Sequence, residues 1–375
     1  MQISLGRKVL FSAVLVLGAL LLCEAALRVR AYIRYGTLGM SVRDPMIHFD
    51  EAAELFVPTP GYRIQGNQVN ISINSLGFRG DEFTREKPHN TVRIAVLGAS
   101  TTFNAEVSSN HATWPHRLQE TLRAAHPGLG IEVINASLGG YVSSDNLKSL
   151  RHRVLPLEPD LVIYYEANNE IVRDTRELAM QRGLIADGGR PPRIVELARY
   201  SLMFDLAYKN LAILVRGRSE SGRKMDNVPN ELPRRFIQTL DEMRQELDRK
   251  GIPFVVSTFI VKYRRDQERS LQIANADVAF YYMPWMSIDG LLSAMEVYNQ
   301  AILDFAASRR LHVVDDRYAI PPTAEYFTDC MHLADKGAEA MAARFHKYFE
   351  EHGIVEQLGG AATVSPAVTQ GGESR

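Results

Sequence analysis

The sequence predicts an α/β fold with three layers, in which a five-stranded parallel sheet lies between two layers of helices. The alternation of two kinds of segment along the chain supports this prediction. Short apolar runs of strand length alternate with segments whose apolar residues recur every three or four positions, and this alternation favours a parallel sheet with right-handed crossovers. The first thirty residues differ from the rest, because they contain an apolar run long enough to form a single transmembrane helix.

The N-terminal segment, residues 1–30, is predicted to be a membrane anchor. Arg7 and Lys8 precede an uncharged apolar run, residues 9–23. Continued through Leu27, this run would rise about 28 Å as a helix, close to the thickness of the hydrocarbon core. A cleaved signal peptide is the competing interpretation, although the residues before a possible cleavage site match poorly. We expect a retained anchor with the rest of the chain on the extracytoplasmic, periplasmic side, but arginines flank both ends of the run and leave the orientation open.

Residues 31–90 are predicted to form an extended region of strands and turns, in which residues 69–73 (VNISI) alternate like a half-buried strand. The regular alternation follows in residues 91–355. Its predicted strands cover residues 92–97, 131–134, 160–165, 253–257 and 311–314. Helical stripes are predicted at residues 114–122, 144–154, 236–247, 291–305 and 334–349.

Two segments do not follow this alternation. Residues 171–231 combine charged stretches, a turn rich in glycine and proline, and apolar patches. We expect an insertion over the carboxyl end of the sheet, either a lid or a surface that faces the membrane. Residues 356–375 carry little apolar mass, so a disordered tail is predicted there.

Composition and motif searches exclude several classes of function. The chain has 43 basic and 44 acidic residues and no basic stripe interleaved with aromatics, so nucleic acid is not an expected partner. Cys23 lies in the apolar N-terminal run and Cys330 is far from it in the sequence, so a disulfide between them is not expected. Phosphate-loop, dinucleotide-binding and zinc-binding patterns are missing from the sequence, so we expect no cofactor and no metal. Three histidines are expected to be solvated residues that flank helices: His111, His116 and His126.

Polar motifs follow the ends of successive predicted strands, where ligands bind in parallel α/β sheets. Gly98-Ala-Ser-Thr-Thr102 places Ser100 after a buried strand and before a helix, where backbone N–H groups can stabilise an oxyanion. Asp329-Cys-Met-His332 can supply a base and a carboxylate that orients it. Each motif taken alone is equally compatible with a helix cap or a surface turn.

Two further motifs could supply oxyanion donors. Glu166-Ala-Asn-Asn-Glu170 places consecutive amides after the third strand, and Asn135-Ala-Ser-Leu-Gly-Gly-Tyr141 contains Gly140, whose backbone can approach a substrate closely. Turn chemistry is the alternative for both. Together the four motifs provide a nucleophile, a base, an orienting acid and oxyanion donors, which is the set that acyl transfer requires.

With these motifs, residues 92–350 resemble the SGNH/GDSL hydrolase family, which has a flavodoxin-like fold and four blocks named for Ser, Gly, Asn and His. Ser100 matches in LGASTTF, Gly140 in NASLGGY, Asn169 in ANNE, and Asp329 with His332 in FTDCMHLADKG. The resemblance implies that Ser100 attacks, that His332 is the base and that Asp329 orients it. It also implies that the oxyanion is bound by the Ser100 and Gly140 N–H groups and the Asn169 side chain.

The chain departs from the family pattern in two blocks. Ala99 stands where many members have Asp, and Ala167 and Glu170 replace Gly and Asp in the third block. The register of that block is therefore open, and Asn168 competes with Asn169 for the role of oxyanion donor. The N-terminal anchor and the stretch NSLGFRG are similar to those of membrane-tethered bacterial members.

We therefore expect a serine ester hydrolase that acts through an acyl-enzyme on an O-acyl or O-acetyl ester of a cell-envelope glycan or lipid. Two alternatives stay open: an O-acyltransferase to envelope polysaccharide with the same triad, and a non-catalytic module that binds a glycan or a partner. Neither the substrate nor the acyl-chain length nor any protein partner follows from the sequence. The 171–231 insertion and residues 280–285 (FYYMPW) are candidates for shaping the pocket, although core packing is the more expected role of the aromatic stretch.

Overall fold

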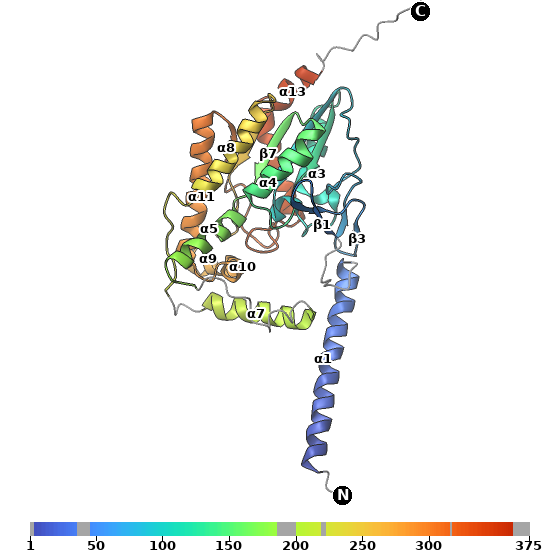
Figure 1. The fold of residues 1–375 in the computed structure, drawn as a ribbon, viewed down its shortest axis with the longest axis vertical. Coiled ribbons are helices and arrows are strands. Elements are labelled where there is room, and N and C mark those ends of the chain that lie inside the picture. Colours follow the sequence, from blue (N-terminus) through green and yellow to red (C-terminus); the bar gives the residue numbers. More distant parts are fainter. Residues whose placement is uncertain (1–3, 36–45, 186–199, 219–222, 316, 363–375) are drawn as a thin grey trace, which may run out of the picture.

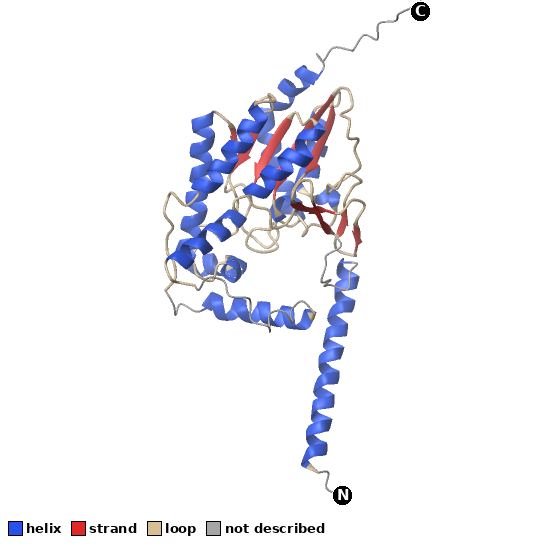
Figure 2. Cartoon of the chain, viewed as in Figure 1, coloured by secondary structure: helices blue, strands red, loops and turns tan. Residues whose placement is uncertain are grey.

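A parallel sheet of five strands forms the centre of the protein, in the order β6-β5-β7-β8-β9. The computed structural model describes residues 4–35, 46–185, 200–218, 223–315 and 317–362. The strands of the sheet are β5 (Thr91–Gly98), β6 (Gly130–Asn135), β7 (Leu161–Tyr165), β8 (Phe254–Ser257) and β9 (His312–Val314). All five predicted strands are present, and the predicted α/β fold is confirmed (Figure 2).

Helices cover both faces of this sheet (Figure 1). The described helices of the body, with short 3-10 and π turns omitted, are α2 (Ser100–Phe103), α3 (Trp114–Ala125), α4 (Ser143–Ser149), α5 (Asn168–Gln181), α7 (Leu202–Arg218), α8 (Arg234–Asp248), α9 (Arg269–Asn275), α10 (Asp277–Tyr282), α11 (Ile288–Arg309), α12 (Asp335–Glu351) and α13 (Ile354–Ala362). The five predicted helical stripes correspond to α3, α4, α8, α11 and α12.

Two consecutive tyrosines of β7 show how the layers are built. Side chains alternate between the two faces of a strand, and Tyr164 contacts Phe236 of α8 while Tyr165 contacts Trp114 of α3. The Trp114 ring in turn stacks on Phe345 of α12, with ring centroids 4.9 Å apart. The sheet is therefore buried on both faces, which explains why its strands are almost uniformly apolar.

Two small antiparallel hairpins precede the central sheet. They pair β1 (Ile47–Asp50) with β2 (Leu55–Pro58), and β3 (Arg63–Gln65) with β4 (Asn70–Ser72). Their buried side chains share a second apolar cluster with Ala99 and Tyr141. This extended region consequently packs against the loops that follow β5 and β6.

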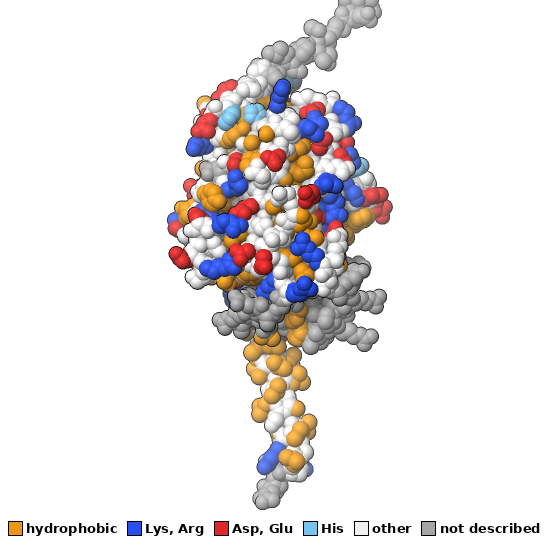
Figure 3. Space-filling model, turned by 90° about the vertical axis from the view of Figure 1, so that its left-hand side faces the viewer, with side chains coloured by type: hydrophobic (Ala, Val, Ile, Leu, Met, Phe, Trp, Pro, Cys, Tyr) orange, Lys and Arg blue, Asp and Glu red, His pale blue; other side chains and the backbone are white. Residues whose placement is uncertain are grey.

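Helix α1 (Leu5–Tyr35) stands away from the body as a stalk whose side chains are largely apolar and exposed (Figure 3). By length and composition it could cross a membrane, or it could be a signal sequence.

The segments outside the regular alternation also have defined structure. The insertion of residues 171–231 continues α5 and contains α7, and residues 186–199 and 219–222 lie outside the described part. The prediction of a disordered tail from residue 356 was wrong for its first residues, because α13 continues to Ala362. Ile354 and Val355 are buried there, and Gly359 lies against Leu129. Residues 363–375 lie outside the described residues.

Candidate active site

Ser100 lies where β5 ends and the short helix α2 begins. The turn between them depends on Gly98. A Cβ atom at this position would come within 2.3 Å of Thr102 Oγ1 and 2.6 Å of the Tyr165 carbonyl oxygen. The absence of a side chain lets the chain turn tightly between neighbouring elements, and Ser100 is left partly exposed at the carboxyl end of β5.

Ser100, His332 and Asp329 form one chain of hydrogen bonds. The imidazole donates from Nδ1 to Asp329 Oδ2 at 2.7 Å, and in this tautomer Nε2 accepts from the Ser100 hydroxyl at 2.8 Å. The second carboxylate oxygen, Oδ1, accepts the backbone N–H groups of Met331 and His332 at 2.9 and 2.8 Å. The structure thus brings together three side chains from two segments that are far apart in the sequence.

Charges around the imidazole favour its protonated form. Burial lowers the pKa of His332, but the hydrogen bond to Asp329 and the nearby carboxylates of Glu106, Asp329 and Glu166 outweigh burial, and the pKa is raised. For Asp329, burial raises the pKa, but the hydrogen bonds with His332 and Met331 lower it by more. The net pKa is lowered, so this carboxyl stays ionised. A base that becomes cationic beside a fixed carboxylate is what proton transfer from a serine needs.

The loop after β6 approaches Ser100 through its two glycines. A Cβ atom at Gly139 would lie 3.8 Å from Ser100 Cβ, and one at Gly140 would meet no heavy atom within 4 Å. Gly140 has a φ of +87°, a backbone conformation that favours glycine. The base of the loop is fixed by Asn135, whose amide donates to the Thr102 carbonyl at 2.9 Å. Space in front of Gly140 is therefore open next to the serine.

The two asparagines of the third block make different contacts. The Asn169 side chain donates to the Tyr141 carbonyl at 2.9 Å, and its backbone N–H donates to Glu166 Oε1 at 2.6 Å. Asn168, the first residue of α5, is 5% exposed, and its side-chain oxygen Oδ1 is buried without a hydrogen-bond partner within the part of the chain that the structure describes. The Asn169 side chain ties the third block to the glycine loop, whereas the Asn168 side-chain oxygen is not held by any such bond.

The carboxyl of Glu166 is much less acidic than an ordinary glutamate. Burial raises its pKa to about 8, against the effect of the backbone N–H groups of Asn168 and Asn169. Its position at the end of β7 was visible in the sequence, but its effect on His332 was not, because only the folded chain brings the two side chains near each other.

Arg79 supports the serine turn and was not identified from the sequence. Its guanidinium donates to the carbonyls of Phe103 and Asn104, both at 2.7 Å, and to Asn110 Oδ1 at 3.0 Å. These carbonyls end the helix that Ser100 begins. Burial lowers the pKa of Arg79 to about 9. Arg79 belongs to the stretch NSLGFRG, and this motif was the sequence feature that could have pointed to it.

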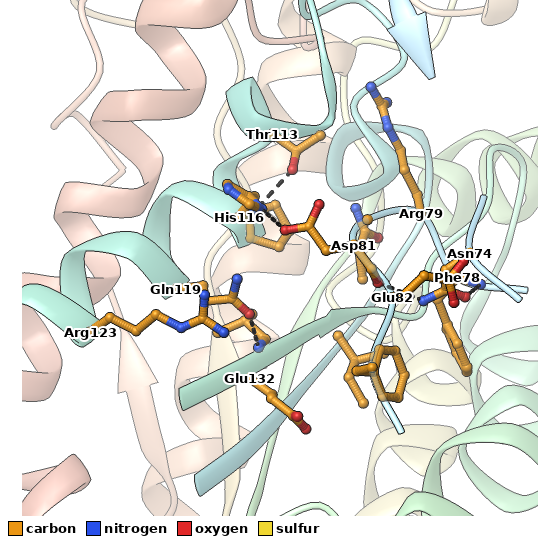
Figure 4. Close-up of a pocket in the computed structure, with 16 residues that line it drawn as sticks. Asn74, Phe78, Arg79, Asp81, Glu82, Thr113, His116, Gln119, Arg123 and Glu132 are labelled. Atoms are coloured by element: carbon orange, nitrogen blue, oxygen red, sulfur yellow. Dashed lines mark hydrogen bonds and ion pairs between the residues drawn. The ribbon is translucent and has the colours of Figure 1, made fainter. Parts of the chain in front are cut away.

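A cavity of about 220 Å³ lies away from the triad, between residues 74–83 and helix α3 (Figure 4). His116 lies at its edge with Asp81, and the expectation that His116 is solvated was wrong because it is 8% exposed. Together with His111, these residues place possible metal ligands within 4.8 Å of one another. The two imidazoles, however, hydrogen-bond each other at 2.9 Å, so each ring already has a hydrogen-bond partner within the cluster.

Comparison with known proteins identifies one matching family. The model of the GDSL-like lipase/acylhydrolase family matches residues 96–340, an interval that contains every residue of the proposed triad and both asparagines. No curated protein matches the sequence.

Several solved structures are similar to the chain at low identity. One is a lipase/acylhydrolase from Enterococcus faecalis, with 16% identity, a TM-score of 0.42, and coverage of 70% of this chain and 96% of that chain. Another is the acetylxylan esterase Axe2 from Geobacillus stearothermophilus, with 14% identity, a TM-score of 0.43, and coverage of 68% and 93%. A GDSL-like lipase from Bacteroides thetaiotaomicron has 12% identity, a TM-score of 0.38, and coverage of 69% and 88%.

Proposed function

Because the chain belongs to the GDSL-like lipase/acylhydrolase family and is therefore an esterase, we propose that it cleaves an O-acyl ester through an acyl-enzyme on Ser100. The observation that carries this proposal is the 2.8 Å hydrogen bond between Ser100 Oγ and His332 Nε2, continued to Asp329. A serine is a weak nucleophile unless an adjacent base takes its proton. In this chain the base is in contact with the hydroxyl and is itself held by a carboxylate.

The proposed reaction proceeds in two halves. In the first, His332 takes the hydroxyl proton as Ser100 Oγ attacks the ester carbonyl, and the imidazolium then gives that proton to the departing alcohol. In the second, His332 takes a proton from water, the resulting hydroxide attacks the acyl-serine, and the proton returns to Ser100 as the acid leaves. Asp329 stabilises the imidazolium in both halves and keeps the same tautomer.

The developing oxyanion would be bound by the backbone N–H groups of Ser100 and Gly140 and by a third-block amide. Open space in front of Gly140 supports its part in this set. For the amide, we favour Asn168 over Asn169, because the Asn169 side-chain nitrogen is already bonded to the Tyr141 carbonyl, whereas the Asn168 side-chain oxygen has no partner among the described residues and so does not fix that amide in place. The role assigned to Asn169 by the family resemblance would then be one of positioning.

We propose in addition that α1 is a retained anchor that holds the esterase at the outer face of a membrane, where its substrate is an acylated glycan or lipid of the cell envelope. Exposed apolar side chains along α1 and the basic residues at its start support the anchor.

A fluorophosphonate probe tests the assignment of the nucleophile. We expect the wild-type chain to be labelled and Ser100→Ala to remain unlabelled at equal folded concentration, because the probe reacts with an activated serine. Release of free acetate from an acetylated oligosaccharide, absent in Ser100→Ala, then tests hydrolysis against transfer to a second sugar. A folded wild-type chain that resists the probe would refute the proposal.

A further inference from the structure

Helices α1 and α7 are joined by the charges that interrupt the apolar stretch of α1. Glu24 accepts hydrogen bonds from the first two backbone N–H groups of α7, at 3.1 and 3.0 Å, and from the Ser201 hydroxyl at 2.9 Å. Arg28 pairs with Glu24 at 2.8 Å and donates to the Tyr200 carbonyl at 3.1 Å. A carboxylate in α1 therefore caps the N-terminus of α7, which fixes where along α1 the second helix is attached.

The position of this junction matches the thickness of a bilayer. Helix α7 lies across the axis of α1 at the base of the body, while the rest of α1 continues away from it (Figure 1). The part of α1 before the junction, residues 5–23, rises about 28 Å at 1.5 Å per residue, and a hydrocarbon core is about 30 Å thick. Arg7 and Lys8 lie in its first turn, where their long side chains reach the headgroups on the far side. If residues 5–23 span the core, α7 lies along the membrane surface.

The described part of α7 exposes apolar side chains that suit this position. Leu206 is 39% exposed and Leu211 is 60% exposed, and Tyr200, just before the helix, is 63% exposed. A helix that lies in the interface buries such side chains at the boundary between headgroups and acyl chains. A bilayer at the position set by α1 would cover these exposed side chains.

The candidate active site opens toward the same end of the protein. Helix α13 packs near Leu129, beside the start of β5 and β6, and Figure 1 places α13 and α7 at opposite ends of the body. The carboxyl ends of the strands, including the turn with Ser100, therefore face the end where α7 lies. Cys330, between Asp329 and His332, lies close to the backbone of Ala279 in α10, and α10 packs against α7.

We propose that α7 lies in the membrane interface and that the catalytic serine receives its ester from the bilayer, so that the substrate is an acylated amphiphile whose carrier is anchored in the membrane. This inference rests on the proposed esterase function and on the anchor. Glu24 and Arg28 set the height of the body above the bilayer, and α10 connects α7 to the segment that carries His332. An ester at headgroup level would reach Ser100 without leaving the membrane surface.

The first test compares two esters with the full-length protein in vesicles of phosphatidylethanolamine and phosphatidylglycerol. One is p-nitrophenyl acetate in solution, and the other carries the same acetyl ester on a chromophore linked to a phospholipid headgroup. At equal bulk concentration we expect the lipid-borne ester to be cleaved at least about tenfold faster, because both reactants are confined to one surface. Equal rates, or a faster reaction with the soluble ester, would overturn the proposal.

A charge variant of α7 shows whether the helix carries this preference. In Leu206→Glu/Leu211→Glu we expect the rate on the lipid-borne ester to fall about tenfold and the rate on p-nitrophenyl acetate to stay within about twofold of wild type. Lys347→Glu is the matched control, since it changes the net charge equally at an exposed position of α12. A variant that lowers both rates alike, or neither, contradicts a membrane role for α7.

A depth measurement tests the position of α7 without using activity. In a Cys23→Ser background the remaining cysteine, Cys330, is buried, so a fluorophore can be attached at Leu211→Cys or, as a control, at Lys347→Cys. We expect phospholipids brominated near the headgroup to quench the first fluorophore and not the second; equal quenching, or none at 211, would overturn the placement.

If fluorophosphonate fails to label Ser100, the esterase proposal and the substrate inference both fail. Quenching at residue 211 would then show that the placement of α7 is correct and that the assigned catalytic reaction is wrong.

Discussion

Replacing Arg79 by methionine tests how strongly the serine turn depends on one buried guanidinium. The substitution removes one donor from three buried acceptors, the carbonyls of Phe103 and Asn104 and the Asn110 side-chain oxygen. The Asn110 oxygen keeps the Ser72 N–H at 3.2 Å and the Asn104 carbonyl keeps the Val107 N–H at 3.4 Å, so among the described residues the Phe103 carbonyl loses its donor altogether. Each unpaired buried acceptor costs about 1–3 kcal/mol. Part of this loss is offset because the buried cation, whose pKa burial lowers to about 9, is removed as well. We expect the free energy of unfolding to fall by about 1–3 kcal/mol.

The effect should extend to catalysis, because the same carbonyls end the helix that Ser100 begins. Urea titration measures the stability of wild type, Arg79→Met and Arg79→Lys, and the rate of fluorophosphonate labelling at a temperature where all three are folded measures the reactivity of Ser100. Lysine keeps the charge but cannot reach three acceptors at once, so its loss of stability should lie between the other two. An Arg79→Met chain as stable as wild type, with unchanged labelling, would refute this reasoning.

Three further predictions concern the reaction itself. Asp329→Asn should lower kcat by about 10³–10⁴-fold on a soluble ester, because the amide cannot hold the same imidazole tautomer; a loss below tenfold would contradict the assigned role. Since the pKa of His332 is raised and the base must be neutral, kcat/KM should rise with pH through a midpoint above the ordinary histidine value of about 6.5; a pH profile with its midpoint below that value would show that the carboxylates do not control the imidazole. Asn168→Ala should lower kcat by about 10²–10³-fold, as expected for a lost oxyanion donor, and Asn169→Ala by less; the reverse order in steady-state kinetics would return the donor role to Asn169.

The strands of the sheet and the positions of their ends could be predicted because they depend on local pattern. Each of the first three apolar runs is followed by a polar motif, and the motif with His332 follows the fifth run. Parallel strands bring such motifs to one edge, so Ser100 and His332 could be paired from the sequence alone. Choosing between Asn168 and Asn169 depended on where α5 begins, and helix boundaries are poorly marked when the capping residue is an alanine, as Ala167 is.

Other features depend on neighbours that are distant in the sequence. The importance of Arg79 follows from carbonyls at residues 103 and 104, and no periodicity in the sequence signals that contact. The first residues of the predicted tail belong to α13. This helix is held by Ile354 and Val355, which are buried at its start, and it packs near β5, although the composition that follows is typical of disorder. Tertiary packing overrode local composition in this case.

The hydrogen bond between Ser100 and His332 joins positions that are 232 residues apart. During synthesis at about 5–20 residues per second, the nucleophile therefore leaves the ribosome roughly 10–50 s before its base exists. For a chain exported N-terminus first behind α1, a competent centre can assemble only after the first 332 of the 375 residues have crossed. In a chain exported in this way, esters on the side of synthesis are not cleaved, because Ser100 has no base until export is nearly complete.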